Sequence, residues 1–277
     1  MLFSKNKAWF KQTLLALSAV AASFSAHSAL DMSDATSRSV SEYIAILPSA
    51  EQKKVDAYHK MIRNHLNQNF SIVRTVRILT SHYPQDVQEI LLAAYQHHPK
   101  QLNVISRAVI RSEAALTSDV LDTALSVAPD DYTQIIRMAI KAEPAYIDDI
   151  VAVAAQHQPN HLEEIVRVAI TVEPDLSGSV IYSAANNSPN GFLDAVVNVF
   201  ASIPESTSNL FYAVKDFFIG QEKVEQPNQL RANPEQWQRF LTIAKAQGVT
   251  KQEMQWLQKQ GYITEEQLAQ AYSRSRN

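Results

Sequence analysis

The 277-residue chain contains no cysteine, and only five of its residues are glycine. Without cysteine there is no disulfide bond and no attachment point for a lipid on an N-terminal cysteine, so stability has to come from the packed core. The sequence also lacks a glycine-rich phosphate loop, an HExxH helix motif and a recognisable grouping of nucleophile, base and orienting acid. We therefore expect a protein that is not an enzyme and that has no cofactor.

The sequence also lacks an excess of basic residues. Its formal net charge is -3 and its pI is near 6.2, whereas nucleic-acid-binding proteins usually show a basic footprint. We therefore expect no nucleic-acid partner. Apolar residues make up 46% of the chain, which predicts a folded protein with a sizeable core.

No apolar run is long enough to cross a membrane. The longest, Leu14 to Phe24, spans about eleven residues, against roughly 20 needed for a bilayer. Lysines precede this run and small residues follow it, which is the order of a secretory signal peptide at 1–29, cleaved after Ser28 or Ala29. A membrane anchor is the alternative. The pattern predicts export to the periplasm of a Gram-negative cell, or to the outside of the cell, with no transmembrane segment in the mature chain.

Prolines recur at intervals of fifteen residues, and eight of the 11 prolines follow this period, with Ala114 at the one vacant place. They are Pro84, Pro99, Pro129, Pro144, Pro159, Pro174, Pro189 and Pro204. Because proline fits the first turn of a helix and not its interior, the period predicts short helical units. Apolar residues at positions 4, 7, 8 and 11 of each unit predict one buried face on a helix of about eleven residues.

The units are of two alternating kinds, so the repeat is thirty residues long and contains two helices. One kind has arginine at its ninth position: Arg77, Arg107, Arg137 and Arg167. The other has an acid at its sixth: Glu89, Asp119 and Asp149. Short helices cannot bury their faces singly and must stack. We therefore predict an all-α fold, a right- or left-curving α-solenoid of five helical hairpins over residues 69–218, which resembles short helical-repeat solenoids in architecture.

Both ends of the chain depart from the repeat. Residues 30–68 form an N-terminal extension with a capping helix, for which Ser49 and Gln52 predict a capping box. Residues 219–233 have the composition of a linker. Residues 234–277 predict three helices over 234–247, 250–260 and 264–273, stopped by glycines and started by capping boxes at Thr250 and Thr264, and we expect them to dock on the solenoid.

A stretch of this C-terminal segment, Leu257 to Leu268, resembles the helical hairpin of short oligomerisation modules. It is also similar to half of the nucleotide-binding motif in the N-domains of some secretion ATPases. The arginine-leucine-glycine that opens that motif is replaced here by Gln252-Glu253-Met254. We therefore expect no cyclic dinucleotide to bind.

The candidate binding residues are the repeated charges. The four arginines form an arginine ladder that should face outward, with rungs roughly 10 Å apart, and arginine suits carboxylates and phosphates. The repeated acids predict a second, acidic face. Both sets could equally be solvated charges copied by duplication. His97 and His157 lie too far apart in the repeat to share a metal ion, and we expect no metal site.

These features lead to three functional hypotheses. The leading one is a non-enzymatic scaffold that binds another envelope or secreted protein. The alternative is an accessory protein that binds an acidic polysaccharide or other polyanion along the arginine ladder. The third is an enzyme whose site is assembled between the solenoid and the C-terminal helices.

Overall fold

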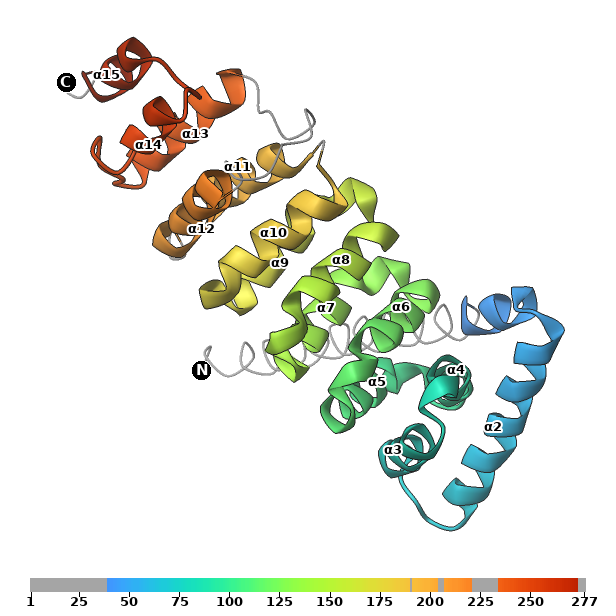
Figure 1. Cartoon of the computed structure of the whole chain (residues 1–277). Coiled ribbons are helices and arrows are strands. Elements are labelled where there is room, and N and C mark those ends of the chain that lie inside the picture. Colours follow the sequence, from blue (N-terminus) through green and yellow to red (C-terminus); the bar gives the residue numbers. More distant parts are fainter. Residues whose placement is uncertain (1–38, 190, 204–206, 221–233, 274–277) are drawn as a thin grey trace, which may run out of the picture.

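The computed structural model describes residues 39–189, 191–203, 207–220 and 234–273, and these form helices and turns without a strand. The signal peptide, Pro204 and residues 221–233 of the expected linker lie outside the described residues, whereas residues 219–220 belong to a helix. The helices follow one another along an elongated molecule (Figure 1). They are α2 (Ser49–Asn67), α3 (Ile72–His82), α4 (Val87–His97), α5 (Leu102–Ser112), α6 (Thr117–Val127), α7 (Tyr132–Ala142), α8 (Ile147–His157), α9 (Leu162–Val172), α10 (Ser177–Asn187), α11 (Phe192–Ser202), α12 (Thr207–Gly220), α13 (Pro234–Ala246), α14 (Gln255–Lys259) and α15 (Glu265–Ser273).

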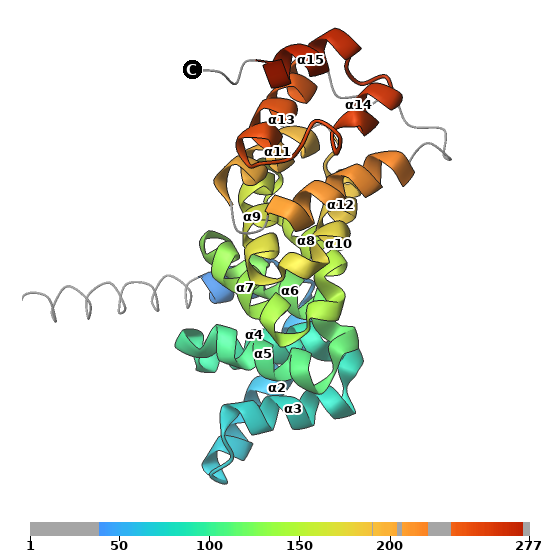
Figure 2. The same ribbon diagram turned by 90° about the vertical axis from the view of Figure 1, so that its left-hand side faces the viewer.

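The helices stack in two layers. In the odd layer, α3, α5, α7, α9, α11 and α13 each pack against the next, and in the even layer α2, α4, α6, α8, α10 and α12 do the same. Helices that are consecutive in the chain also pack against each other across the layers, so each pair forms a hairpin. The stack runs from α2 and α3 at one end to the C-terminal helices at the other (Figure 2). The predicted all-α solenoid of helical hairpins is confirmed.

Each repeat unit has the same backbone. From α3 to α11 every α-helix is eleven residues long, and the helices from α4 to α10 each follow a three-residue 3₁₀ turn. Six of these seven turns begin with proline, and Ala114 begins the seventh. The residue before each turn lies outside the helical region, as at Glu143 (φ -148°, ψ 85°), and a following proline disfavours that helical region. Proline therefore starts a 3₁₀ turn ahead of the α-helix and not the α-helix itself.

Polar residues in these turns do not cap the helices with their side chains. No side-chain cap bond forms at Pro129–Asp131 or Pro159–His161. Backbone bonds replace them: the Asp131 N–H donates to the Ala128 carbonyl at 3.1 Å. The 3₁₀ turn itself thus satisfies amides that a side-chain cap would otherwise have to bind.

At the N-terminal end, α2 covers α4 and so closes the even layer. The capping box expected at Ser49 and Gln52 does not form, because the helix already begins at Ser49 and its cap position is Pro48. The Gln52 side chain instead donates to the carbonyls of Ala45 and Leu47, at 3.1 and 2.8 Å. These bonds attach α2 to the helical residues 39–46 that precede it.

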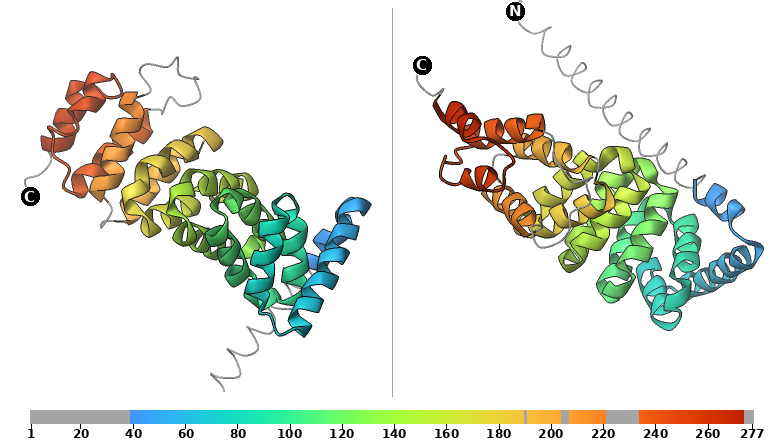
Figure 3. Two further views of the ribbon diagram at one scale, coloured as in Figure 1. Left: turned by 60° about the horizontal axis from the view of Figure 1, so that its bottom comes forward. Right: turned by 45° about the horizontal axis from the view of Figure 1, so that its top comes forward.

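At the C-terminal end, α13 packs on α11 and so extends the odd layer. The orange and red helices adjoin the last repeat helices (Figure 3). An aromatic cluster forms this contact: Phe240 stacks on Phe200 and Phe211, with ring centroids 5.4 and 6.3 Å apart, and Trp237 meets Phe218 edge-on at 4.8 Å. The C-terminal segment is therefore docked by a shared core.

The C-terminal helices are shorter than expected in one place. Residues 251–254 form turns, so the helix expected over 250–260 is reduced to α14. Both capping boxes do form: Glu253 accepts from the Thr250 amide at 2.8 Å, and Gln267 accepts from the Thr264 amide at 2.7 Å. Gly248 and Gly261 have φ of 88° and 74°, a region that glycine adopts readily, and they end the preceding helices.

None of the described helices is both long enough and apolar enough to cross a membrane.

Candidate functional site

Three of the four ladder arginines lie exposed at equivalent places on successive odd helices. Arg77 is on α3, Arg107 on α5 and Arg137 on α7, and none of them forms an ion pair with a described residue. Their exposure follows from the repeat, because the ninth position points about 140° away from the buried fourth position. The structure thus brings these three expected residues onto one outer face.

Further cations accompany these three arginines. Two grooves lie between successive odd helices, one of about 720 Å³ between α3 and α5 and one of about 420 Å³ between α5 and α7. The cations that line them form a surface that we name the basic strip: Arg74, Arg77, Arg107, Arg111, Arg137 and Lys141. The positive charge of these side chains is hardly balanced by acids, since Glu113 is the one carboxylate among the lining residues of the two grooves.

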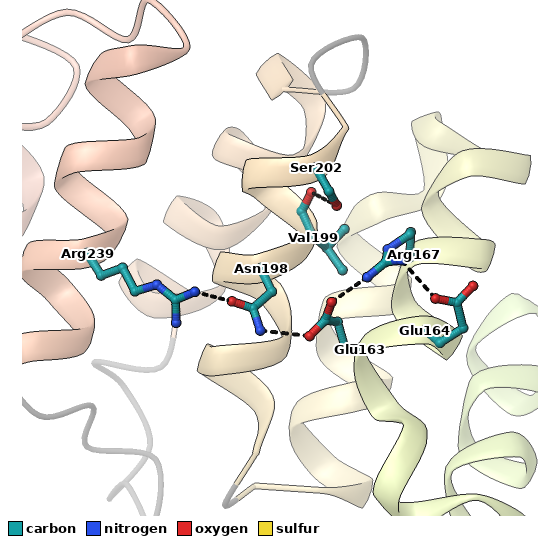
Figure 4. A network of polar contacts seen from close by, with 7 residues as sticks. All are labelled: Glu163, Glu164, Arg167, Asn198, Val199, Ser202 and Arg239. Atoms are coloured by element: carbon teal, nitrogen blue, oxygen red, sulfur yellow. Dashed lines mark hydrogen bonds and ion pairs between the residues drawn. The ribbon is translucent and has the colours of Figure 1, made fainter.

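The fourth ladder arginine, Arg167 on α9, does not belong to this surface. Its guanidinium pairs with Glu163 and, at 2.9 Å, with Glu164 on the same helix. Glu163 also accepts from the Asn198 amide on α11 at 2.7 Å, and Asn198 in turn accepts from Arg239 on α13 (Figure 4). The charge of Arg167 is thus neutralised within a network that reaches the C-terminal helices, and the basic strip ends at α7.

The acids expected on the even layer separate into two groups. Asp119 on α6 and Asp149 on α8 are exposed, as the repeat indicates. Glu89 on α4 is only 6% exposed, because α2 covers it, and its carboxylate lies 3.3 Å from the ammonium of Lys54. Glu89 is therefore part of the α2–α4 contact and is not available on an outer acidic face.

The same contact contains a second acid, Asp86. It accepts from the Lys54 ammonium at 2.7 Å and from the Tyr58 hydroxyl at 2.6 Å. These two hydrogen bonds, first that from Lys54 and then that from Tyr58, lower the pKa of Asp86, while burial and the bond to Asp86 raise the pKa of Tyr58. The group holds the capping helix in place and has the features of a structural contact.

The two histidines compared in the repeat, His97 and His157, have protein partners. His157 on α8 lies 2.8 Å from the Asp122 carboxylate on α6, and His97 on α4 stacks on His59 of α2 with ring centroids 4.0 Å apart. The sequence period does not reveal the His59–His97 pair, because α2 lies outside the period. Within the described ranges, no group of three or more histidines, aspartates or glutamates has a geometry suited to a metal ion.

Comparisons of the chain with protein-family models, with curated proteins and with solved structures gave no match in any of the three. The geometry of the site is therefore the basis for a functional proposal. The basic strip offers guanidinium and ammonium groups that can bind carboxylates or phosphates by charge-assisted hydrogen bonds. Grooves between positively charged walls also concentrate anions near the surface before contact.

Proposed function

We propose that this chain is an exported, non-enzymatic helical-repeat scaffold that binds an acidic envelope or secreted protein across the outer face of α3, α5 and α7. The unpaired cations of the basic strip are the observation that supports the proposal. Exposed charges in folded proteins commonly alternate in sign, whereas here cations on three successive helices line two grooves with one acid among them. Bringing an acidic partner to this face relieves the mutual repulsion of the cations.

Acidic polysaccharide is the second candidate ligand, because the cations of the basic strip lie on helices that follow one another at a regular spacing. The distance from α3 to α7 is about two helix spacings, or roughly 20 Å, which suits an extended polyanion as well as a protein surface. Both candidates require the same cations. They differ in whether the ligand is a protein or a sugar chain.

The experiment measures binding of fluorescent polyglutamate and of fluorescent polygalacturonate to the purified protein over a range of salt concentrations. We expect binding that weakens steeply with ionic strength, because the interaction is between exposed charges. The variant Arg77→Gln, Arg107→Gln, Arg137→Gln should bind at least tenfold more weakly. A matched variant, Lys60→Gln, Lys251→Gln, Lys259→Gln, removes three exposed cations elsewhere and should bind as the wild type does. Equal binding by the two variants would contradict the proposal.

A further inference from the structure

The groove between α5 and α7 has a paired arrangement of cations. Arg107 and Arg111 line it from α5, and Arg137 and Lys141 line it from α7. Each α7 cation follows its α5 counterpart by thirty residues, so the two walls carry matching charges at matching places. No carboxylate belongs to the lining. The groove thus has two successive positions, each flanked by one cation from either wall.

The α3–α5 and α7–α9 helix pairs on either side of this groove lack the paired arrangement of cations. On α3, Ser81 stands where α5 has Arg111, and the α3–α5 groove also includes Glu113. On α9, Thr171 stands where α7 has Lys141, and Arg167 is already paired with Glu163. Among the repeat helices of the described odd layer, α5 and α7 are therefore the two that carry a cation at both positions.

The spacing of the two positions matches an extended peptide. Arg107 and Arg111 are four residues apart on a helix, which corresponds to a rise of about 6 Å along the groove. In an extended peptide, side chains two residues apart point the same way and are separated by about 6.6 Å. Two acidic side chains in an acid-x-acid sequence would therefore reach both positions in turn if the peptide ran along the groove.

The uncharged lining also favours a peptide. Asn103 and Gln134 line the groove with amide groups, which can donate to and accept from the backbone of a peptide. Met138 adds a small apolar surface. The lining contains no aromatic ring and no carboxylate to accept from the many hydroxyls of a sugar chain.

We propose that the α5–α7 groove is the site at which the scaffold binds an extended acidic peptide segment of its partner, with an acid-x-acid sequence lying along the groove. This inference rests on the proposed function and adds the class of ligand and its place. Each carboxylate accepts hydrogen bonds from one cation of each wall, the first from Arg107 and Arg137 and the second from Arg111 and Lys141. The peptide backbone lies over Asn103 and Gln134.

The test compares two labelled nonapeptides of identical composition by fluorescence anisotropy, up to millimolar protein. In one peptide, two glutamates are separated by one serine, and in the other they are adjacent. We expect the spaced peptide to bind at least fivefold more tightly, because adjacent side chains of an extended chain point to opposite sides. The variants Arg107→Gln, Arg137→Gln and Arg111→Gln, Lys141→Gln should each weaken the spaced peptide at least tenfold.

Two control variants distinguish this site from the rest of the strip. Arg74→Gln, Arg77→Gln removes strip cations outside the groove and should weaken the spaced peptide less than either groove variant does. Lys251→Gln, Lys259→Gln removes cations outside the strip and should bind the spaced peptide within twofold of the wild type. Circular dichroism melting confirms that every variant is folded.

Three other results would overturn the inference, and each shows which part of the proposal is wrong. If the spaced peptide loses affinity through Arg74→Gln, Arg77→Gln and not through the groove variants, the site is wrong and the proposed function stands. If polygalacturonate binds and neither peptide binds at millimolar protein, the ligand class is wrong and the polysaccharide candidate is favoured. If neither polymer nor peptide binds, the proposed function fails together with the inference.

Discussion

The imidazole ring of His97 on α4 stacks on that of His59 on α2, with ring centroids 4.0 Å apart and planes inclined by 20°. His97 Nε2 also lies 3.3 Å from the His59 carbonyl oxygen, to which its N–H donates. Two imidazoles in this geometry repel each other when both are protonated. The capping helix is therefore held to the solenoid by a contact that requires at least one neutral ring.

The first prediction is that the protein becomes less stable as the pH falls below about 6.5. Burial, with repulsion from His97 as the second cause, lowers the pKa of His59 and of His98 from the ordinary value of 6.5. The unfolded chain therefore takes up protons at a higher pH than the folded chain, and the free energy of unfolding decreases as the pH falls. Arg63 also lowers the pKa of His59, while Gln96 and Asp56 raise it without reversing the shift.

Urea unfolding between pH 7.5 and 5.0 measures this effect. Asp86 does not interfere, because its pKa lies below 3.8 and its contribution is lost only at lower pH. The variant His59→Gln should reduce the pH dependence. His161→Gln changes an exposed histidine on another part of the solenoid and serves as the control. A stability that is flat over this range in the wild type would contradict the prediction.

The second prediction concerns the hydrogen bond between Tyr58 and Asp86. Tyr58 is 6% exposed and donates to Asp86 at 2.6 Å, so Tyr58→Phe removes the bond and leaves the ring in place. We expect a loss of about 1–2 kcal/mol in the free energy of unfolding, since the acceptor is charged. Tyr182→Phe, at a tyrosine that is 58% exposed, should leave stability within about 0.5 kcal/mol of the wild type.

The third prediction concerns the interrupted proline period at Ala114. The preceding residue, Glu113, has φ -148° and ψ 88°, close to the -148° and 85° of Glu143 before Pro144. The backbone is therefore already suited to proline, and Ala114→Pro should stabilise the protein by about 0.4–1 kcal/mol by restricting the unfolded chain. Chemical denaturation measures the difference.

Ala128→Pro is the contrasting variant for this prediction. The Ala128 N–H donates to the Ala124 carbonyl at 3.0 Å, and proline would remove that bond. This variant should therefore be destabilised. If Ala114→Pro and Ala128→Pro were destabilised alike, the conclusion that the backbone at position 114 is suited to proline would be wrong.

The fourth prediction concerns the docking of the C-terminal helices. Trp237 is 1% exposed and packs against Phe218 and Tyr262, with ring centroids 4.8 and 4.6 Å away. Trp237→Ala should cost about 3–5 kcal/mol and free the C-terminal helices from α11 and α12. Limited proteolysis should then cleave the C-terminal segment faster, with Gln238→Ala, an exposed neighbour, as the control. Unchanged cleavage would show that other contacts hold the segment.

Much of the fold follows from local chemistry and could be predicted from the sequence. Proline fixes its own φ and lacks an N–H, so the prolines of the fifteen-residue period mark the starts of the units. The apolar period then determines the buried face. For the same reason the outward positions of Arg107 and Arg137 could be predicted, since they depend on the angle around a single helix.

Of the two residues that sequence reasoning misjudged, Glu89 depends on a contact with a distant segment, whereas Arg167 is paired with neighbours on its own helix. Glu89 has the place of an exposed acid in its unit, but α2 lies outside the period and covers it. Arg167 repeats the ladder position, but its neutralisation involves Glu163, which also binds Asn198 on another helix. The presence of Glu163 four residues before Arg167 was a signal in the sequence that the ladder would end there.

The central claim is that acidic ligands bind the outer face of the odd layer, and site-specific photo-crosslinking tests it most directly. Val104 on α5 is 46% exposed and neighbours Arg107 on the odd layer, while Tyr182 on α10 is 58% exposed on the even layer. A photoreactive benzophenone residue is placed at position 104 in one protein and at position 182 in another, and each is irradiated with labelled polyglutamate. The account predicts strong crosslinking from position 104, abolished by high salt, and background crosslinking from position 182. Crosslinking from position 182 that equals or exceeds that from position 104 would contradict it.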